Sequence, residues 1–453
     1  MRKVKILLIN PPFHRLFGEK KQWYPLGIYY IRGFLNSFDE IEAYAYNLDN
    51  SDILDGEKLL SYKERYYNSV YYDVDKENIL WDEVKNKIIE LSPDIVGIYS
   101  FSEGFASAIK VSKITKGINP DIVTILGGPH VDCISEQDKN YFCYLIEGEG
   151  EIKLLNIIAE KFSNIRNDLK NKLYKQYKSL LNDSFISDID TLPFPFSEKD
   201  KDIINNNTKL PLLCIRGGCP LSCSYCTCSI AKPTPFRIRS IDKIIEELIN
   251  NYNLFKVTKY FIVDDTFTYN REYIEKFCNK VKQLKFRISW SCTTHVKYID
   301  AELLNLMKNA GCHSIHIGIE TGSSQIMKLI NKSTTIEEIK EKASLIKKAD
   351  IKLKTFYMVG FPEETKKDIE ETKKLIKELA ADEAMLHIYI PYPKTRLYRR
   401  IEEKYSDFNS IDWKTFKRLE LQAHKYMGEG MKQDDVLKKE ISDFFSFIEE
   451  YEK

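Results

Sequence analysis

Four cysteines lie within ten positions of the segment GGCPLSCSYCTC, residues 217–228. Cys219, Cys223 and Cys226 follow the spacing C-x3-C-x2-C, and Cys228 comes two residues later. Three thiolates at this spacing can bind three irons of a cubane [4Fe-4S] cluster, because a loop with a glycine pair before it and a proline inside can curl around the cluster. The fourth iron is then open to another ligand. The alternative is a zinc site that uses Cys228 as well, although two ligands separated by one residue rarely both point inward.

Composition limits the setting in which these thiols work. Ten cysteines in 453 residues are too sparse for a disulfide framework, so their clustering favours metal or redox chemistry. The 68 basic and 67 acidic residues leave a net charge of +1, which gives no electrostatic reason to expect nucleic acid or a membrane surface as partner. The start, MRKVKILLINPPF, predicts a strand rather than a signal peptide, and no apolar run of about 18 residues predicts a membrane span. We expect a cytosolic protein of two or three domains.

Strand-like and helix-like segments alternate through residues 1–160. This alternation is typical of a parallel sheet with helices on its faces, so we predict a doubly wound, Rossmann-like α/β domain there. Its ligand crevice should lie past the carboxyl ends of the strands. The predicted strands are residues 3–9, 42–48, 94–100, 121–127 and 142–148.

The second half of the chain repeats the alternation after a polar, lysine-rich linker over residues 161–210. Six strand-and-helix units over residues 211–395 predict a partial barrel of the (β/α)6 TIM type, in which chemistry gathers at the carboxyl ends of the strands. The cysteine segment follows the first of these strands. The predicted strands are residues 212–218, 260–265, 286–292, 313–320, 353–360 and 384–390.

Helix signals support this assignment at two places. After the cysteines, Ser240 is an expected N-cap, and the apolar residues that follow it form one stripe. Residues 396–453 predict a helical C-terminal region whose last helix closes the domain. The first stripe is Ile241, Ile244, Ile245, Leu248, Ile249 and Tyr252, and the second is Val436, Leu437, Ile441, Phe444, Phe445 and Phe447.

The cysteine motif, with Tyr225 just before its last cysteine, resembles the signature of the radical S-adenosylmethionine (radical SAM) superfamily, and the resemblance covers residues 211 to about 395. It implies that the open iron binds S-adenosylmethionine (SAM), whose reductive cleavage yields a 5′-deoxyadenosyl radical. VDDTF resembles the family's acidic segment, IGIETGS its fourth-strand motif and YMVGFPEET its adenine-side glycine motif. The SAM-binding residues implied are Tyr225, Asp264, Asp265, Glu320, Thr321, Ser323, Val359 and Gly360.

One position departs from the family pattern. Relatives usually carry an arginine where His295 stands, and both a surface histidine and a ligand to the cofactor stay open there.

The first domain resembles the cobalamin-binding domain of the cobalamin-dependent branch of this superfamily. The alternative is a doubly wound domain that has kept the fold without the corrinoid. His14 is not expected to bind cobalt, because its loop PPFHRLFG has Pro12 where the ligating D-x-H-x-x-G motif has aspartate. The cobalamin-binding residues implied are Pro12, Ser100, Ser102, Gly127, Gly128, Glu147 and Gly148.

The resemblance implies an anaerobic, cytosolic enzyme that methylates an unactivated carbon or phosphorus centre. One SAM methylates the corrinoid, and a second generates the radical that prepares the substrate to accept the methyl group. The substrate would be a small molecule or a peptide, and a protein such as flavodoxin or ferredoxin would supply electrons. A cobalamin-binding relative that cyclises or rearranges its substrate is one alternative, and a non-catalytic corrinoid or metal carrier is another.

Overall fold

The computed structural model describes residues 2–17, 24–49, 74, 78–162, 172, 185–229, 236–404, 413–414 and 434–451. The remainder of the predicted linker and of the helical C-terminal region lies outside the described residues, as do the side chains of Val436 and Leu437. The chain divides into two compact units. Unit 1 comprises Met1–Leu60, Asn68–Ile203 and Asp412–Phe416, and unit 2 comprises Ser61–Tyr67, Ile204–Ile411 and Lys417–Lys453.

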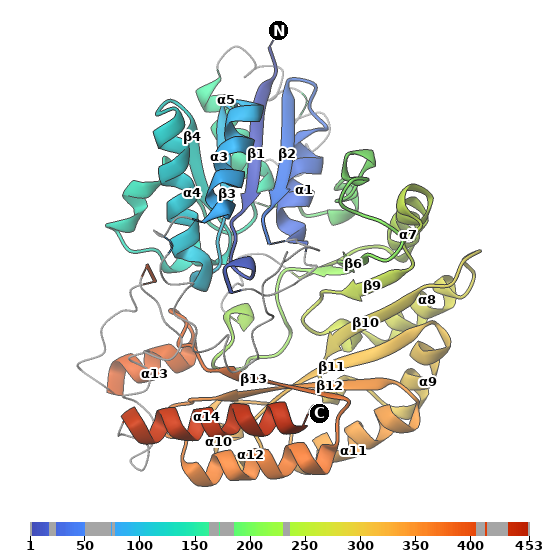
Figure 1. Ribbon diagram of the computed structural model, residues 1–453. Helices are drawn as coiled ribbons and strands as arrows, with labels where there is room; N and C mark the ends of the chain where they lie inside the picture. Colours follow the sequence, from blue (N-terminus) through green and yellow to red (C-terminus); the bar gives the residue numbers. More distant parts are fainter. Residues whose placement is uncertain are drawn as a thin grey trace. The chain divides into compact units, whose positions relative to one another are not determined.

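Unit 1 is a five-stranded parallel sheet in the order β2-β1-β3-β4-β5 (Figure 1). Helices α1 and α5 contact each other, and so do α3 and α4, as expected for a sheet covered on two faces. The order reverses between β1 and β3, which makes their carboxyl ends the switch point at which such sheets bind ligands. The elements are β1 (Val4–Asn10), α1 (Leu26–Leu35), β2 (Ile41–Asn47), α3 (Ile79–Leu91), β3 (Ile95–Tyr99), α4 (Phe105–Ile118), β4 (Val123–Gly127), β5 (Tyr144–Ile146) and α5 (Glu151–Lys161).

The described end of the predicted linker packs on unit 1. Arg32 of α1 is buried and forms two hydrogen bonds of 2.6 Å with the carboxylate of Asp200. The ring of Phe196 contacts Tyr24 and Tyr29. Burying an ion pair is favourable only with good geometry, and this pair is bidentate. Residues 185–203 therefore extend the core of unit 1, while the domain boundaries at 160, 210 and 395 stay a prediction.

Unit 2 is a six-stranded parallel sheet in the order β13-β12-β11-β10-β9-β6. A second, antiparallel pair joins β7 to β8. The prediction of a doubly wound domain followed by a partial barrel is confirmed. The strands are β6 (Lys209–Leu212), β7 (Ile215–Arg216), β8 (Arg237–Ile238), β9 (Lys259–Ile262), β10 (Ser289–Thr294), β11 (Cys312–Glu320), β12 (Lys352–Val359) and β13 (Glu383–Ile388).

Helices line one side of this sheet in Figure 1. The strands alternate accordingly: in β12, Leu353, Thr355, Tyr357 and Val359 are buried, whereas the residues between them are partly or fully exposed. We call the partly exposed side the inner face of the barrel. The helices of unit 2 are α7 (Ile241–Phe255), α8 (Arg271–Val281), α9 (Ala301–Asn309), α10 (Ser324–Leu329), α11 (Ile336–Lys348), α12 (Lys366–Leu379), α13 (Arg396–Lys404) and α14 (Asp434–Tyr451).

The last helix closes unit 2, as its apolar stripe predicts. In α14, Ile441, Phe444 and Phe445 are buried, and the helix lies against α12 and β13. Lys366 of α12 binds Glu440 at 2.8 Å, and the Tyr451 hydroxyl donates to the carbonyl of Ala381. None of the described helices combines the length and the apolar character that crossing a bilayer requires.

Candidate functional site: a cysteine loop and two sets of strand ends

The cysteine loop follows β7 and is held by segments distant in sequence. Gly217 and Gly218 both have positive φ, at 108° and 99°, which turns the chain out of the strand. The backbone N–H of Ser224 donates to the carbonyl of Ile330 at 2.8 Å, and its carbonyl accepts from Leu397 N–H at 2.8 Å. Asn331 donates to the carbonyl of Ser222 at 2.8 Å. The loop is therefore fixed by the end of α10 and the start of α13.

The three predicted ligand thiols lie close enough to influence one another. Burial raises the pKa of Cys219 and of Cys223, and Cys226 raises both further. The Cys219 thiol lies 3.2 Å from the hydroxyl of Thr266. Yet among the described residues no group of three or more His, Cys, Asp or Glu side chains closes on a single metal ion, as a zinc site requires. Three thiols at this spacing on one loop are the donor set that a [4Fe-4S] cluster takes.

Cys228 lies beside this group. Its hydrogen bond with Cys226 raises its pKa, and burial and Asp265 raise it further. Its thiol therefore approaches the third cysteine of the motif.

Tyr225 of the cysteine loop meets Glu320 and Lys332 around one carboxylate oxygen. The Tyr225 hydroxyl donates to Glu320 Oε1 at 2.9 Å, and Lys332 Nζ donates to the same atom at 3.1 Å. The Lys332 and Glu320 side chains are only 6% and 10% exposed. Lys332 also lowers the pKa of Cys223, so its positive charge lies near the cysteine loop. We call Tyr225, Glu320 and Lys332 the Glu320 cluster.

Backbone geometry makes the Glu320 cluster possible. Glu320 ends β11 with φ 73°, in the left-handed region that non-glycine residues rarely adopt. This turn folds its carboxylate back over Gly318, where an added Cβ would lie 2.2 Å from Glu320 Oε1 and 3.3 Å from Lys332 Nζ. Gly318 therefore leaves the space that the carboxylate and the ammonium occupy.

His295 follows β10 and is buried, with 3% of its surface exposed. The surface alternative for this residue is therefore wrong. Its Nδ1 accepts the backbone N–H of Lys297 at 3.3 Å and caps the short helical turn Val296–Tyr298. Burial lowers the pKa of His295 to about 3, and the charges of Lys332 and Lys297 lower it too. The ring is therefore neutral at physiological pH.

The two aspartates after β9 differ in their surroundings. Asp264 is buried, and its Oδ1 accepts from the backbone N–H groups of Cys214 and Ile215 at 3.0 and 2.9 Å. Burial raises its pKa to about 7 despite these bonds. Asp265 is exposed, and a cavity of about 180 Å³ lies beside both carboxylates and Gly217. Asp264 thus holds the strand before the cysteine loop, and Asp265 lies beside the cavity and close to Cys228.

The hydroxyls after β11 are engaged within the protein. Ser323 N-caps α10, accepting from Ile326 N–H, and it also donates to Asp368. Thr321 lies 3.3 Å from the hydroxyl of Thr372 and is fully buried. These two predicted residues shape the loop next to Glu320, and the structure does not direct their hydroxyls into the Glu320 cluster.

The loop after β12 is held by a buried carboxylate. Gly360 has φ 100°, and an added Cβ would lie in van der Waals contact with Ile388 at 3.6 Å. Glu364 Oε2 accepts from Gly360 N–H at 2.6 Å and Phe361 N–H at 3.2 Å. Burial raises the pKa of Glu364 to about 8, although these bonds lower it. Val359 itself is buried towards the helices.

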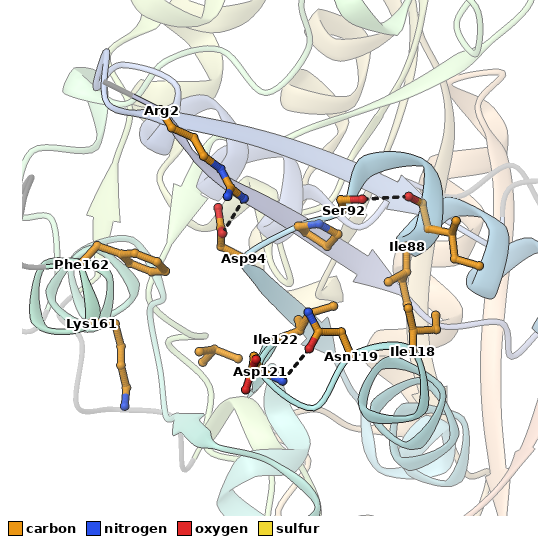
Figure 2. A pocket seen from close by; sticks show the side chains of 13 residues that line it. Arg2, Ile88, Ser92, Asp94, Ile118, Asn119, Asp121, Ile122, Lys161 and Phe162 are labelled. Atoms are coloured by element: carbon orange, nitrogen blue, oxygen red, sulfur yellow. Dashed lines mark hydrogen bonds and ion pairs between the residues drawn. The ribbon is translucent and has the colours of Figure 1, made fainter.

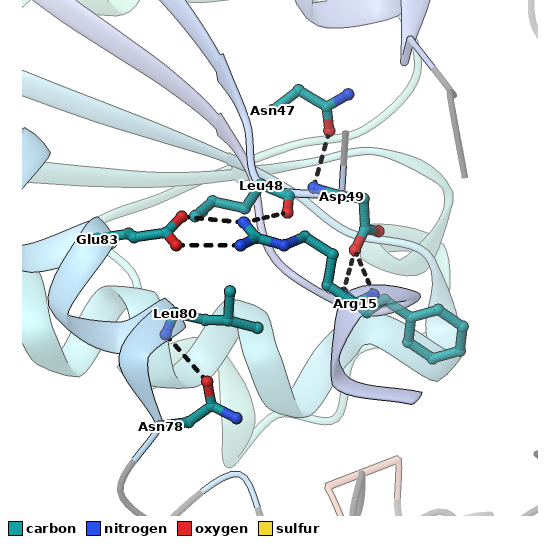
Figure 3. Close-up of polar contacts among 8 residues, drawn as sticks. Arg15, Asn47, Leu48, Asp49, Asn78, Leu80 and Glu83 are labelled. Atoms are coloured by element: carbon teal, nitrogen blue, oxygen red, sulfur yellow. Dashed lines mark hydrogen bonds and ion pairs between the residues drawn. The ribbon is translucent and has the colours of Figure 1, made fainter. Parts of the chain in front are cut away.

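In unit 1, the loop after β1 is pinned by Asp49, just after β2, and by Glu83 of α3 (Figure 3). Buried Asp49 accepts from Phe13 N–H at 2.6 Å and Arg15 N–H at 3.4 Å. Arg15 forms a bidentate pair with Glu83 at 2.9 and 3.0 Å. Burial raises the pKa of Asp49, and the charge of His14 lowers it. The loop lacks its own aspartate, but the chain just after β2 supplies a carboxylate beside His14.

The loops after β3 and β4 hold each other. The Ser100 hydroxyl donates to its neighbour's carbonyl at 2.9 Å, and the Ser102 hydroxyl lies 3.1 Å from His130 Nδ1. At Gly128, with φ 100°, an added Cβ would lie 2.6 Å from the carbonyl oxygen of Ser100. Gly127 has no neighbour within 4 Å of its Cβ position. Gly128 therefore packs against protein, whereas Gly127 leaves room for a ligand.

The remaining predicted corrinoid residues differ in exposure. Pro12 is buried, whereas Glu147 and Gly148 are exposed after β5. Gly148 has φ 71° and, like Gly127, nothing within 4 Å of its Cβ position. Two glycines at neighbouring strand ends thus leave an open cradle at the carboxyl edge of the sheet.

A cavity of about 510 Å³ lies at the opposite, amino edge of unit 1 (Figure 2). Arg2 binds Asp94 there at 2.9 Å, and Ile88, Ile122 and Phe162 supply apolar walls. Asp94 also accepts from Lys5 N–H, so it caps the sheet. This cavity is far along the strands from the switch point and is not the predicted crevice.

Two protein-family models match the chain. The model described as "Radical SAM superfamily" matches residues 213–376, and that described as "B12 binding domain" matches residues 20–158. Residues 213–376 are thus identified as a radical SAM domain and residues 20–158 as a B12-binding domain. The cofactors of these two domains are a [4Fe-4S] cluster, SAM and cobalamin. The cysteine loop and the Glu320 cluster lie within the first match, and the open glycine cradle lies within the second.

Curated relatives resemble most of the chain in sequence, and a solved structure resembles it in fold. An uncharacterized methyltransferase of Pyrococcus horikoshii is 27% identical over 414 residues, which cover 88% of this chain and 83% of the relative. An anaerobic magnesium-protoporphyrin IX monomethyl ester cyclase of Rubrivivax gelatinosus is 26% identical, covering 90% and 71%. The fold matches the radical SAM methyltransferase TsrM of Kitasatospora setae, solved with cobalamin and a [4Fe-4S] cluster, with TM-score 0.66, 12% identity and coverage of 98% and 89%.

Three polar side chains of the site escaped the sequence analysis. Lys332 lies twelve positions after Glu320, between two helices, and carries no motif of its own. Thr266 and Glu364 stand inside the recognised segments VDDTF and YMVGFPEET but were not singled out. Their positions at strand ends are the signal that could have indicated them.

Proposed function

We propose that this protein is a cobalamin-dependent methyltransferase that acts on an unactivated carbon or phosphorus centre. The observation that carries the proposal is the union of a B12-binding domain with a barrel whose cysteine loop faces a buried, charged cluster. Similarity to the Pyrococcus horikoshii methyltransferase over 88% of the chain favours methyl transfer as the reaction. When bound, the cluster and SAM supply a deoxyadenosyl radical, and the corrinoid supplies the methyl group.

In this proposal the residues of unit 2 hold and orient SAM. Cys219, Cys223 and Cys226 bind three irons and leave the fourth for the amino and carboxylate groups of SAM. Glu320 is positioned by Tyr225 and Lys332 to accept from a cofactor hydroxyl or ammonium. The other proposed SAM residues act mainly through the backbone they shape: Asp264, Asp265, Thr321, Ser323, Val359 and Gly360.

Unit 1 would hold the corrinoid mostly through backbone and shape. Gly127 and Gly148 leave room at the strand ends, and Pro12 and the two serines that follow β3, Ser100 and Ser102, shape the floor between them. Gly128 and Glu147 complete the proposed set. Since the loop PPFHRLFG around His14 has no aspartate of its own, we propose that cobalt lacks a protein imidazole.

The protein is proposed to work anaerobically in the cytosol on a small molecule or peptide, with electrons from a flavodoxin or ferredoxin. The reconstituted enzyme is tested with SAM and a reductant, and 5′-deoxyadenosine and S-adenosylhomocysteine are measured. A methyltransferase forms both when its substrate is present, in equal amounts. A carrier protein would form neither, and that result would refute the proposal.

A second function is favoured by the similarity to the Rubrivivax gelatinosus cyclase, which covers 90% of the chain. A cyclising or rearranging enzyme would form 5′-deoxyadenosine with its substrate but no matching S-adenosylhomocysteine. The ratio of the two products therefore separates the two functions.

A further inference from the structure

His295 has a buried ring nitrogen that the protein leaves without a partner. Its Nδ1 is occupied as an acceptor from Lys297 N–H, so the proton of the neutral ring is on Nε2. Among the described residues, no hydrogen-bond acceptor reaches this Nε2–H. A buried donor without an acceptor is costly, and such groups are rare in folded proteins. The nitrogen is therefore available to a ligand.

The backbone directs this ring to the inner face of the barrel. His295 has φ −112° and ψ 141°, which continues the extended backbone of β10. Trp290, Cys292 and Thr294 are buried on the helix side of the sheet. Because successive side chains of an extended strand alternate between its two faces, His295 points to the inner face. Thr294 pairs with Ile317, which places His295 beside Gly318 in the neighbouring strand.

Gly318 marks the position of the Glu320 cluster on that face. The space above Gly318 holds Glu320 Oε1 and Lys332 Nζ. The charge of Lys332 lowers the pKa of His295, which independently indicates that the two groups are near each other. The neutral N–H of His295 and the ammonium of Lys332 thus face one region, next to Cys223.

This region suits an anion. Glu320 already accepts hydrogen bonds from Tyr225 and Lys332 through one oxygen. Lys332 has three N–H groups and uses one on Glu320, so it can serve a second carboxylate. His295 adds a donor without adding charge. SAM carries one carboxylate, on its methionine part.

We propose that His295 Nε2–H donates a hydrogen bond to the carboxylate of SAM, beside the ammonium of Lys332. His295 is then a binding residue for SAM that takes, in this chain, the place where relatives usually carry arginine. The inference rests on SAM use but not on methyl transfer. It holds equally for a rearranging enzyme.

Two substitutions separate the two nitrogens of the ring. His295→Asn keeps an acceptor for Lys297 N–H but has no donor at the Nε2 position. His295→Gln reaches the Nε2 position with an N–H donor but loses the cap. His313→Leu is the matched control, because His313 is a half-buried histidine at the far end of β11 that bonds Ser289 at 3.0 Å.

The readout is binding by anaerobic equilibrium dialysis of reconstituted enzyme, with SAM and with decarboxylated SAM. Iron content and circular dichroism check that each variant is intact. In the wild type, SAM should bind more tightly than the decarboxylated compound. His295→Asn should reduce this preference by about 10- to 100-fold, as expected for one hydrogen bond to a charged group. His295→Gln and His313→Leu should keep most of it.

Three results would overturn the inference. His295→Asn could leave the preference unchanged, or it could weaken both ligands equally, which would indicate a structural role. Loss of the preference in His295→Gln but not in His295→Asn would assign the effect to the cap. None of these results bears on methyl transfer, because the dialysis contains no methyl acceptor.

Discussion

In unit 2, the ends of β10 and β11 present charged and polar side chains to a shared space, and at least one buried nitrogen there has no protein acceptor. In unit 1, Asp49 and Ser102 at the strand ends hydrogen-bond the protein itself, although Asp49 Oδ2 and His130 Nε2 have no partner among the described residues. Unit 1 also leaves two glycine positions open. We infer that unit 2, with its buried ion pair, recognises its ligand by charge, whereas unit 1 recognises its ligand mainly by shape and backbone.

The difference agrees with the chemistry of the two cofactors. SAM is small and carries an ammonium, a carboxylate and a sulfonium, so a few placed charges can orient it. A corrinoid is large and has a broad flat face, so an open edge of a sheet can hold it over a wide area. Substitutions of single polar residues should therefore affect unit 2 more than unit 1.

The largest effect is expected at the cysteine loop. Alanine in place of Cys219, Cys223 or Cys226 should abolish SAM cleavage, because each removes a ligand of the cluster. Cys228→Ser should keep the cluster, although its thiol lies beside Cys226. Anaerobic iron analysis and deoxyadenosine formation are the measurements. Zinc instead of iron in the reconstituted protein, or cluster loss in Cys228→Ser, would contradict the assignment.

A smaller but still large effect is expected from Lys332→Met. Removing one partner of a buried ion pair leaves the other charge buried, which typically costs about 3–5 kcal/mol. We expect SAM to bind at least about tenfold more weakly. Lys354→Met is the control, because Lys354 pairs with a Glu383 that is 56% exposed on the same sheet and should cost at most about 1 kcal/mol. Equal losses in the two variants would contradict the special role of Lys332.

The sequence predicted the first of these two features, the cysteine loop, but not the second, Lys332. The three cysteines form a local motif, so their spacing alone indicated a cluster. Lys332 meets Glu320 only because the chain turns through φ 73° at Glu320 and Gly318 leaves space, which no linear pattern records. Asp49 was missed for a similar reason, since it reaches the β1 loop from the chain after a neighbouring strand.

The bounds of helices and strands were predictable to within a few residues where the hydrophobic period was clear. They and the buried residues were less predictable where polar pairs are buried. In α7, Ser240 caps the helix as predicted, but Ile249 of the predicted stripe is 42% exposed. Glu247 is buried instead and binds Arg239 at 2.6 Å, a pairing that hydrophobic periodicity cannot indicate. The first barrel strand was placed at residues 212–218, whereas β6 ends at Leu212 and two glycines with positive φ end β7.

A moderate effect on the pH dependence of stability is expected from Glu364→Gln. Burial raises the pKa of Glu364 to about 8 in the fold, above the ordinary value of 4.5. Between these two values the folded protein binds a proton that the unfolded chain has lost, so stability falls as the pH rises from about 5 to 8. Glutamine accepts the same backbone bonds without titrating. Over this pH range the free energy of unfolding of the Glu364→Gln variant should fall less than that of the wild type, by at least about 1 kcal/mol.

Urea unfolding of the two proteins at pH 5.5 and pH 8 measures this difference. Parallel pH profiles would show that Glu364 does not titrate in this range.

The smallest effect is expected in unit 1. His14→Ala should leave the bound corrinoid and its absorption spectrum unchanged, because shape rather than imidazole ligation holds it there. Asp49→Ala is the informative partner variant, since it removes the acceptor that pins the β1 loop. It should weaken corrinoid retention where His14→Ala does not. A histidine nitrogen coupling in the Co(II) spectrum of the wild type would reverse this prediction.

The central claim is that the two units act together in methyl transfer, and labelled SAM tests it most directly. Anaerobic enzyme with cobalamin and a reductant is incubated with SAM that carries a trideuterated methyl group, and the extracted corrinoid is analysed by mass spectrometry. The account predicts that the corrinoid gains the trideuterated methyl group. Deoxyadenosine formation with a corrinoid that never gains the label would contradict the claim and assign the protein to the rearranging enzymes.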